Sequence, residues 1–256
     1  MNLLGSMAVA FSMYSRIPVP QVKWTKERME YAMCFFPLIG AVIGSLLVGL
    51  WKISEAAGLS VIARSCFGTV LPVVVTGGIH MDGFADTVDA LSSCQPKEKK
   101  LEILKDPHAG AFAIIGIVSY MMVFFGLFAE LSSQGLLLFA SVPVMSRALS
   151  GLSVVSFPKA KKSGLAAMFA DSSKKMAVGI AMVLSWIIAA AWFFVMGGIW
   201  TSVILMGISI AGFGAYYALG KRAFGGITGD VAGYFLQLEE LLLLFGIAAA
   251  GKIELF

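Results

Sequence analysis

A succession of long apolar segments limits this chain to one kind of structure. Seven stretches of about 18 to 23 residues carry few charged side chains, and each is long enough to cross a bilayer as a helix. Only 13% of the 256 residues are charged, so a water-exposed surface could not be covered. We therefore predict a polytopic membrane protein with spans near residues 33–51, 61–79, 110–130, 135–156, 177–195, 200–219 and 231–250.

The predicted spans are helices, because a helix satisfies its backbone hydrogen bonds within its own segment. A membrane β-barrel would need segments of about ten residues with alternating polarity, and the sequence has none. We expect an all-α bundle that forms one transmembrane catalytic domain over residues 1–256. The apolar start of the chain, within residues 1–30, is predicted to be a short interfacial helix. The boundary between the fifth and sixth spans rests on Gly197 and Gly198.

Basic residues predict the orientation of the bundle. With a cytoplasmic N-terminus, the inner loops are residues 1–32, 80–109, 157–176 and 220–230, and they hold 15 of the 19 lysines and arginines. This distribution follows the positive-inside rule. It also accounts for the net charge of +4 without a nucleic-acid partner, because no stripe of basic and aromatic residues accompanies it.

The most informative polar segment follows the second span directly. Asp82, Asp86 and Asp89 are spaced by four and three residues, which places them on one face of a helix. Three carboxylates on one face repel one another unless a cation lies between them. Mg²⁺ is the natural candidate, because it is a hard cation that proteins bind through a few carboxylates plus substrate phosphates. The alternative is a solvated acidic helix end, stabilised by its place in the first turn.

His80 and the pair Lys105–Asp106 belong to the same predicted cytoplasmic loop. His80 is a candidate base or metal ligand, and its structural alternative is an interfacial side chain that donates to a carbonyl. We expect Lys105 to contact a phosphate and Asp106 to lie near the metal. The alternative is that these two side chains pair with each other at the surface.

Arg147, Thr228 and Asp230 are candidates for substrate binding. Arg147 lies inside the fourth span, where a guanidinium is costly unless it faces a ligand, a polar interior or an acidic partner, and its fork suits phosphate oxygens. Thr228 and Asp230 follow two glycines at the start of the last span, a pattern typical of a phosphate-binding turn. Asp230 is also a good helix N-cap, which would be a structural role.

Two further features leave alternatives open. Lysines at positions 159, 161 and 162 form a basic loop, which topology alone explains and which could also bind an anionic substrate. Glu239 and Glu240 lie inside the last span, where a carboxylate raises a functional hypothesis by default.

The acidic segment 77–91 (GGIHMDGFADTVDAL) closely resembles the signature of the cobalamin synthase family, whose enzymes are also named adenosylcobinamide-GDP ribazoletransferases. Further resemblances follow in family order over essentially the whole chain, at residues 15–20, 36–40, 106–112 and 225–231. The acidic signature is specific, whereas the proline and glycine segments are weak alone. Two positions depart from the family pattern: Gln237 stands where many relatives carry Glu, and His108 where an Arg is expected.

The resemblance implies a reaction and its partners. The family joins adenosylcobinamide-GDP to α-ribazole or its 5′-phosphate with Mg²⁺, and releases GMP with cobalamin or its phosphate. It implies in-line phosphoryl transfer, with the three aspartates of the acidic segment holding the metal and Lys105 and Arg147 steadying phosphate oxygens. Asp106 or His80 would take the proton from the ribazole 3′-hydroxyl. The remaining partner is the lipid bilayer of a bacterial cytoplasmic membrane, and a homo-oligomer is left open.

Two other classes compete with this interpretation. CDP-alcohol phosphotransferases also cluster aspartates at a membrane boundary, but their pattern places Ala-Arg soon after Asp-Gly, and here Ala85 is followed by Asp86. An ion- or proton-coupled transporter could use the aspartates and Arg147 as a path. The sequence shows neither the inverted repeats nor the helices broken deep in the membrane that are typical of transporters.

Overall fold

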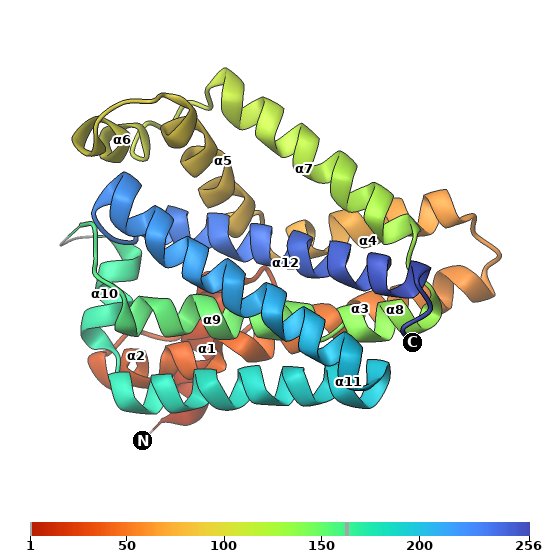
Figure 1. Ribbon diagram of the computed structural model, residues 1–256. Helices are drawn as coiled ribbons and strands as arrows, with labels where there is room; N and C mark the ends of the chain where they lie inside the picture. Colours follow the sequence, from red (N-terminus) through yellow and green to blue (C-terminus); the bar gives the residue numbers. More distant parts are fainter. Residues whose placement is uncertain (1, 162–163) are drawn as a thin grey trace.

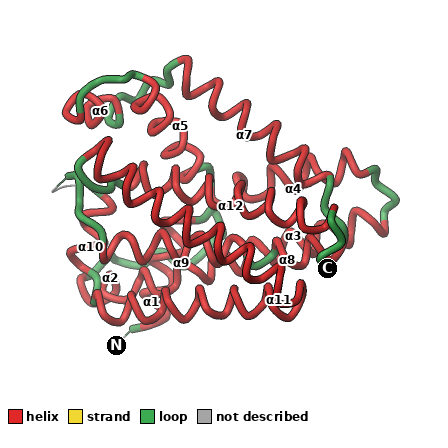
Figure 2. Tube along the Cα trace, viewed as in Figure 1, coloured by secondary structure: helices red, strands yellow, loops and turns green. Residues whose placement is uncertain are grey.

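The computed structural model describes residues 2–161 and 164–256, and within them the regular structure is helical apart from one isolated bridge between Lys159 and Ile227 (Figure 1, Figure 2). The predicted all-α bundle is confirmed. The helices in chain order are α1 (Leu3–Tyr14), α2 (Lys26–Ala32), the 3₁₀ helix η1 (Met33–Phe35), α3 (Phe36–Ala56), α4 (Val61–Thr76), α5 (Ile79–Ser92), α6 (Lys97–Ile103), α7 (Ala111–Ala129), α8 (Ser133–Phe139), α9 (Val142–Ser156), α10 (Leu165–Ser172), α11 (Lys175–Phe224) and α12 (Gly229–Lys252).

The longest helix, α11, is two helices folded against each other. A straight helix of its 50 residues would be about 75 Å long, far more than a bilayer of about 30 Å. Gly198 has a φ of 74°, outside the helical range, and the chain reverses there (Figure 1). Hydrogen bonds from Ser202 to Ala190 O (3.4 Å) and from Trp186 to Ser209 Oγ (3.4 Å) join the two halves. The predicted break at Gly197–Gly198 is therefore confirmed.

Five helical stretches in the described ranges are long and apolar enough to cross a membrane: 26–56, α7, 133–156, α11 and α12. Helices α4 and α5 meet the same criterion as a pair bent by 95°. Taking α4 as the crossing of this pair, with α5 bent away from it, and dividing α11 at Gly198 gives the seven apolar crossings that the sequence predicts.

The loops predicted to be cytoplasmic meet at one end of the bundle. In Figure 1, α1, α2, α6, α10 and the α11–α12 junction lie at the left, whereas the C-terminus and the reversal of α11 lie at the right. The basic loops therefore share one side of the molecule, as the positive-inside pattern requires. That this side faces the cytoplasm remains a prediction.

Helix α1 exists as predicted, and it packs closely on the bundle. Its first turn is capped by Asn2, whose Oδ1 accepts from the Gly5 amide at 2.8 Å. Val9 and Ala10 are fully buried. The chain after α1 is held by the Arg16 amide, which donates to Val75 O at 2.7 Å. These contacts bring the end of α1 beside the turn between α4 and α5; an interfacial location for the helix remains a prediction.

Small residues allow α3 to approach the end of α8 and the start of α9 at backbone distance. Gly40 and Gly44 have the small-xxx-small spacing that lets membrane helices meet closely. A Cβ atom built on Gly44 would overlap the carbonyl of Ala140, and one built on Gly40 would overlap that of Pro143. The crossing therefore depends on glycine at both positions.

We expect Gly44→Ala to destabilise the protein by about 1–3 kcal/mol, because the added methyl overpacks against backbone that cannot move away. Gly49→Ala is the matched control on the same helix, since a Cβ there would meet no atom within 4 Å. The control should be neutral or stabilising by up to about 1 kcal/mol. Thermal unfolding of the detergent-solubilised proteins measures both effects. Equal melting temperatures for the two variants would contradict this account of the crossing.

Candidate active site

The acidic helix α5 begins at a turn that only glycine forms easily. Gly77 and Gly78 have φ values of 66° and 79°, in the left-handed region, so they end α4 and redirect the chain by 95°. Helix α5 then presents Asp82, Asp86 and Asp89 along one face, as their spacing predicts.

Helix α12 crosses α5 where no side chain separates them. A Cβ atom on Gly83 would lie 2.9 Å from Asp230 Cα, and one on Gly233 would lie 3.1 Å from His80 O. This contact brings Asp230, in the first turn of α12, beside the aspartates of α5. Two segments about 150 positions apart in the sequence thus form one acidic cluster.

Burial and the neighbouring carboxylates together raise the pKa of Asp86, the central member of the cluster. Asp86 is half-buried on α5, which is not by itself long enough to span. Burial raises the pKa of Asp86 to about 6, and the charges of Asp82, Asp230 and Asp89 act in the same direction. Lys161 acts in the opposite direction. A cation placed among these carboxylates would relieve their repulsion.

Asp89 points toward α7. Its Oδ2 accepts from the Gly110 amide at 2.6 Å and its Oδ1 accepts from the Ala113 amide at 2.8 Å. Both carboxylate oxygens therefore satisfy free amides at the start of α7, in the manner of a helix cap supplied from another helix. The predicted role of Asp89 as a metal ligand is untested, and its visible role is to fix α7 to α5.

We expect Asp89→Ala to cost about 0.5–2 kcal/mol of stability, the usual range for a lost helix cap, because two amides of α7 lose their acceptor. Asp89→Asn keeps one acceptor oxygen and should lose less. Thermal unfolding together with Mg²⁺ titration of turnover measures both properties. A large rise in the Mg²⁺ requirement of Asp89→Asn at unchanged stability would favour the ligand role instead.

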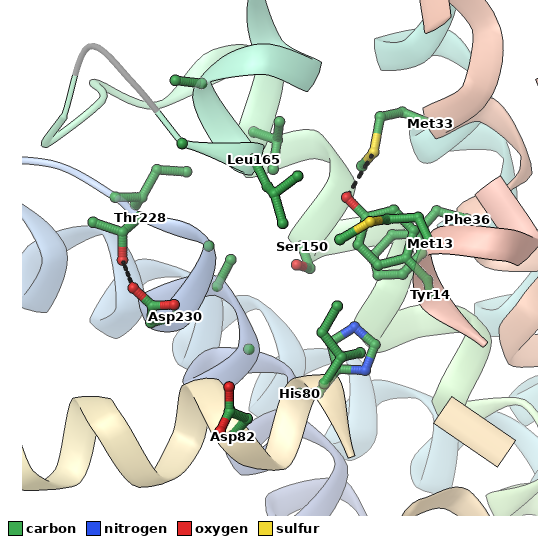
Figure 3. A pocket seen from close by; sticks show the side chains of 18 of the residues that line it. Met13, Tyr14, Met33, Phe36, His80, Asp82, Ser150, Leu165, Thr228 and Asp230 are labelled. Atoms are coloured by element: carbon green, nitrogen blue, oxygen red, sulfur yellow. Dashed lines mark hydrogen bonds between the residues drawn. The ribbon is translucent and has the colours of Figure 1, made fainter. Parts of the chain in front are cut away.

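A cavity of about 280 Å³ opens beside the acidic cluster. Four predicted site residues line it, and Figure 3 shows them around the same space: His80, Asp82, Thr228 and Asp230. Lys159 and Lys161 of the basic loop line it as well. The cavity thus combines carboxylates with ammonium groups, the combination that a phosphate ester and a divalent cation require together.

The basic loop is fastened to the start of α12 by backbone pairing. The Ala160 amide donates to Ile227 O at 2.9 Å, and the Ile227 amide donates to Pro158 O at 2.8 Å. Gly226 permits this approach, since a Cβ atom there would lie 2.5 Å from Pro158 O. The pairing fixes both lysines beside Thr228 and Asp230.

The helix cap of α12 is Thr228, not Asp230 as its residue type suggested. Thr228 Oγ1 accepts from the Val231 amide at 3.2 Å and donates to Asp230 Oδ2 at 3.2 Å. Asp230 lies inside the first turn. Because it is not the residue that caps the helix, its half-buried carboxylate stays at the cavity.

Lys161 belongs electrostatically to the same site. Burial lowers the pKa of Lys161, while Asp230 and Asp86 raise it. The charge of Lys105 also lowers the pKa of Lys161, although this predicted phosphate contact is outside the cavity lining. Membrane topology alone explains the basic loop, and the geometry of Lys161 also fits the substrate-binding alternative. Lys162 of this loop lies outside the described residues.

Asp106 lies apart from the cavity and is exposed. It accepts from the His108 amide at 3.0 Å and lies 2.8 Å from His108 Nδ1. These two bonds lower the pKa of Asp106, the backbone bond first. The surface pair of Lys105 with Asp106 that the sequence left open is therefore not seen among the described contacts, and Asp106 pairs with His108 instead.

Arg147 is buried in an ion pair and does not reach the cavity. Its Nη1 donates to Glu240 Oε1 at 2.9 Å, and Ser146 Oγ donates to the same oxygen at 2.8 Å. The acidic partner is thus Glu240 of α12. Nearby, Gln237 accepts from the Tyr120 hydroxyl at 2.9 Å, so this departure from the family pattern also has a buried partner.

The sequence did not single out the apolar wall of the cavity. Met13 and Tyr14 of α1, with Met33 and Phe36 from the start of the first span, lie on the side of the cavity opposite Thr228 (Figure 3). Within apolar segments these residues resemble ordinary core residues, and no local sequence feature distinguishes a cavity wall from a core position.

The donor atoms of the site fit Mg²⁺ in type. Among residues 2–161 and 164–256, no three carboxylate, imidazole or thiol groups converge into a preformed metal centre. Asp82, Asp86 and Asp230 nevertheless offer hard oxygen donors at one place. Mg²⁺ characteristically takes one or two carboxylates and completes its shell with water and substrate phosphates. An incomplete set of carboxylates beside a cavity lined by lysines suits that mode.

The fold and the cavity define a multi-pass membrane protein that gathers carboxylate and ammonium groups at one end of its bundle. The family model of cobalamin-5-phosphate synthase matches residues 6–248. A protein of Lachnoclostridium phytofermentans named adenosylcobinamide-GDP ribazoletransferase is 43% identical over 256 residues, covering 100% of this chain and 98% of its own length.

Two further relatives carry the same name. The one from Clostridium perfringens is 32% identical and covers 93% of this chain and 96% of its own length. The one from Fusobacterium nucleatum is 27% identical and covers 91% and 93%. No solved structure matches the chain. The chain belongs to the cobalamin-5-phosphate synthase family and is a transferase of cobalamin synthesis.

Proposed function

We propose that this chain transfers the cobinamide phosphate of adenosylcobinamide-GDP to α-ribazole or α-ribazole 5′-phosphate, with Mg²⁺, in a bacterial cytoplasmic membrane. The observation that carries the proposal is the juxtaposition of Asp82 and Asp230 with Lys159 and Lys161 in one cavity. Family membership supports the substrates, since the relatives are named for that transfer.

The charged residues of the site form two groups, carboxylates for the metal and lysines for the phosphates. Asp82 and Asp86, with Asp230 across from them, would hold Mg²⁺. When bound, the ion neutralises charge on the pyrophosphate oxygens during in-line transfer. Lys161, on the same side of the cavity as Asp230, would contact phosphate oxygens. Lys159 would join it by giving up the pair that its ammonium makes with Asp171 at the surface.

Further contacts orient the phosphates and the acceptor. The start of α12 adds the partial positive charge of a helix N-terminus, which Thr228 orders. Lys105 and Arg147 do not line the cavity. Lys105 would act on the phosphates only through its charge at a distance. Arg147 would act indirectly, because its ion pair with Glu240 supports α12.

The bond changes follow from the chemistry of the substrates. The 3′-hydroxyl oxygen of the ribazole attacks the phosphorus that carries cobinamide, and the bond from this phosphorus to the bridging oxygen breaks. That oxygen leaves with GMP. The hydroxyl proton passes to a carboxylate of the cavity, Asp82 or Asp230, because Asp106 lies outside it.

Purified protein in detergent should release GMP from adenosylcobinamide-GDP only when α-ribazole phosphate and Mg²⁺ are both present. Phosphorus-32 in the phosphate next to cobinamide should appear in the corrinoid product, and the GMP should be unlabelled. EDTA should stop the reaction, and renewed Mg²⁺ should restore it. Label in the nucleotide product, or no product from well-folded protein, would contradict the proposal.

A further inference from the structure

The two sides of the cavity differ in chemistry. Thr228 and Asp230 lie on one side in Figure 3, whereas Met13, Tyr14 and Phe36 gather on the other, around His80. The rings on this apolar side are close: His80 and Tyr14 are parallel with centroids 6.2 Å apart, and His80 and Phe36 are 5.7 Å apart. A flat, largely apolar group would complete this cluster of aromatic rings.

The apolar side contains polar atoms that the protein itself leaves without good partners. His80 is 6% exposed, and neither of its ring nitrogens has a hydrogen-bond partner among the described residues. The Tyr14 hydroxyl donates to the Met33 sulfur at 3.7 Å, and a thioether is a weak acceptor. Buried polar atoms without partners are costly, so an imidazole in this condition at a cavity indicates a ligand.

Resting on the proposed transferase function, we infer that the apolar side of the cavity binds the benzimidazole base of α-ribazole, with the His80 imidazole donating to its free ring nitrogen. A neutral imidazole has one N–H donor, and this base offers one unsubstituted ring nitrogen as acceptor. The rest of the base is apolar and flat, which suits the walls formed by Tyr14, Phe36 and Met13.

The same wall is unsuited to guanine, the base of the other substrate. Guanine carries donors and acceptors along its whole edge, and burial against Met13, Met33 and Phe36 would leave most of them unpaired. The guanosine part of the donor must therefore lie elsewhere.

The position of His80 relative to the acids fits a nucleoside. His80 and Asp82 are two residues apart on α5, about 3 Å along the helix axis, and both line the cavity. Side chains two positions apart leave a helix on different sides, but both of these reach the cavity, so a base held at His80 keeps its ribose in the same space as the Asp82 carboxylate.

The first test replaces His80 by phenylalanine, which keeps an aromatic ring and removes both nitrogens. We expect the KM for α-ribazole to rise about tenfold, the effect of one lost hydrogen bond, with the KM for adenosylcobinamide-GDP unchanged. Calorimetric binding of α-ribazole alone, without donor or Mg²⁺, should weaken equally. His80→Gln, which retains a donor, should recover part of the affinity.

Tyr14→Leu and Tyr31→Leu form a matched pair for the aromatic wall. Tyr14 lines the cavity, whereas the Tyr31 hydroxyl accepts from Lys174 at 2.9 Å outside it. Loss of the ring at Tyr14 should weaken α-ribazole binding about tenfold or more, the usual effect of a lost base–aromatic contact. Tyr31→Leu should bind α-ribazole as the unaltered protein does.

Three results would overturn the inference. A rise in the KM for the donor in His80→Phe would assign the wall to guanine. A fall in kcat with both KM values unchanged would make His80 the proton acceptor instead. If calorimetry shows that His80→Phe binds α-ribazole as tightly as the unaltered protein, the proposed contact between His80 and the base does not exist.

The binding measurement also separates this inference from the proposed function. His80-dependent binding of α-ribazole without any GMP release would support the base site and contradict the transferase reaction.

If His80→Phe does not fold, an azido-benzimidazole riboside can be photo-cross-linked to the unaltered protein. Labelling of the peptide that contains Met13 and Tyr14 is expected, and labelling confined to other peptides would refute the assignment.

Discussion

Asp82→Asn should lower kcat for GMP release by about 10²–10³-fold, in the range observed when one charge-stabilising group of an active site is lost. Asp82 lines the cavity, and its charge is one of those that raise the pKa of Asp86. Asparagine has nearly the same shape but offers a neutral oxygen, so it holds a divalent ion poorly. The variant should fold at least as well as the parent, because the repulsion among Asp82, Asp86 and Asp230 falls.

Glu102→Gln is the control for that experiment. Glu102 is an exposed acid on α6 that pairs with Lys99 at 2.8 Å, remote from the cavity lining. As in Asp82→Asn, a carboxylate becomes an amide and one negative charge is lost. The turnover of Glu102→Gln should equal that of the parent protein. Single-turnover GMP release at several Mg²⁺ concentrations, with thermal unfolding of each variant, provides the comparison. Full turnover by Asp82→Asn would remove the metal part of the proposal.

Arg147→Met should destabilise the protein by about 3–5 kcal/mol, because it leaves Glu240 charged and without its partner inside the bundle. Arg147 is 1% exposed, so water cannot replace the lost contact. The double variant Arg147→Met with Glu240→Leu should recover most of the stability, since an apolar pair can replace a buried ion pair. The recovered protein should release GMP at a rate near that of the parent.

Arg64→Met is the matched control for Arg147→Met. Arg64 meets Glu55 at 3.4 Å, and that carboxylate is largely exposed. Loss of such a pair costs at most about 1 kcal/mol. Thermal unfolding measures all the variants, and GMP release per folded molecule measures their activity. An Arg147→Met protein that is stable but inactive, with no rescue by the second substitution, would show that Arg147 binds a phosphate as the sequence predicted.

Local patterns predicted the elements of the fold well. Apolar runs located the spans, because bilayer thickness sets their length. Two glycines located the reversal inside α11, because Gly198 adopts a φ that other residues avoid. The spacing of Asp82, Asp86 and Asp89 gave the acidic face of α5, because helical periodicity depends on sequence distance alone.

The contacts between segments that are distant in the sequence could not be predicted from the sequence. Arg147 pairs with Glu240, 93 positions away, because α9 and α12 pack against each other. Asp89 turned toward α7 for the same reason. Which helices become neighbours depends on close approaches such as that of Gly83 to Asp230, and a single sequence contains no signal for such a pair. The apolar wall from α1 also arises only in three dimensions.

Iron-directed cleavage of the backbone tests most directly whether α5 and α12 together hold the metal. Fe²⁺ replaces Mg²⁺ in the purified protein with adenosylcobinamide-GDP present, and ascorbate with peroxide generates radicals that cut the chain near the ion. We predict cuts near residues 82 and 230, suppressed by excess Mg²⁺ and absent from Asp82→Asn. Cuts confined to the region of Glu239 and Glu240, or cuts that Mg²⁺ does not suppress, would contradict the placement of the active site in this cavity.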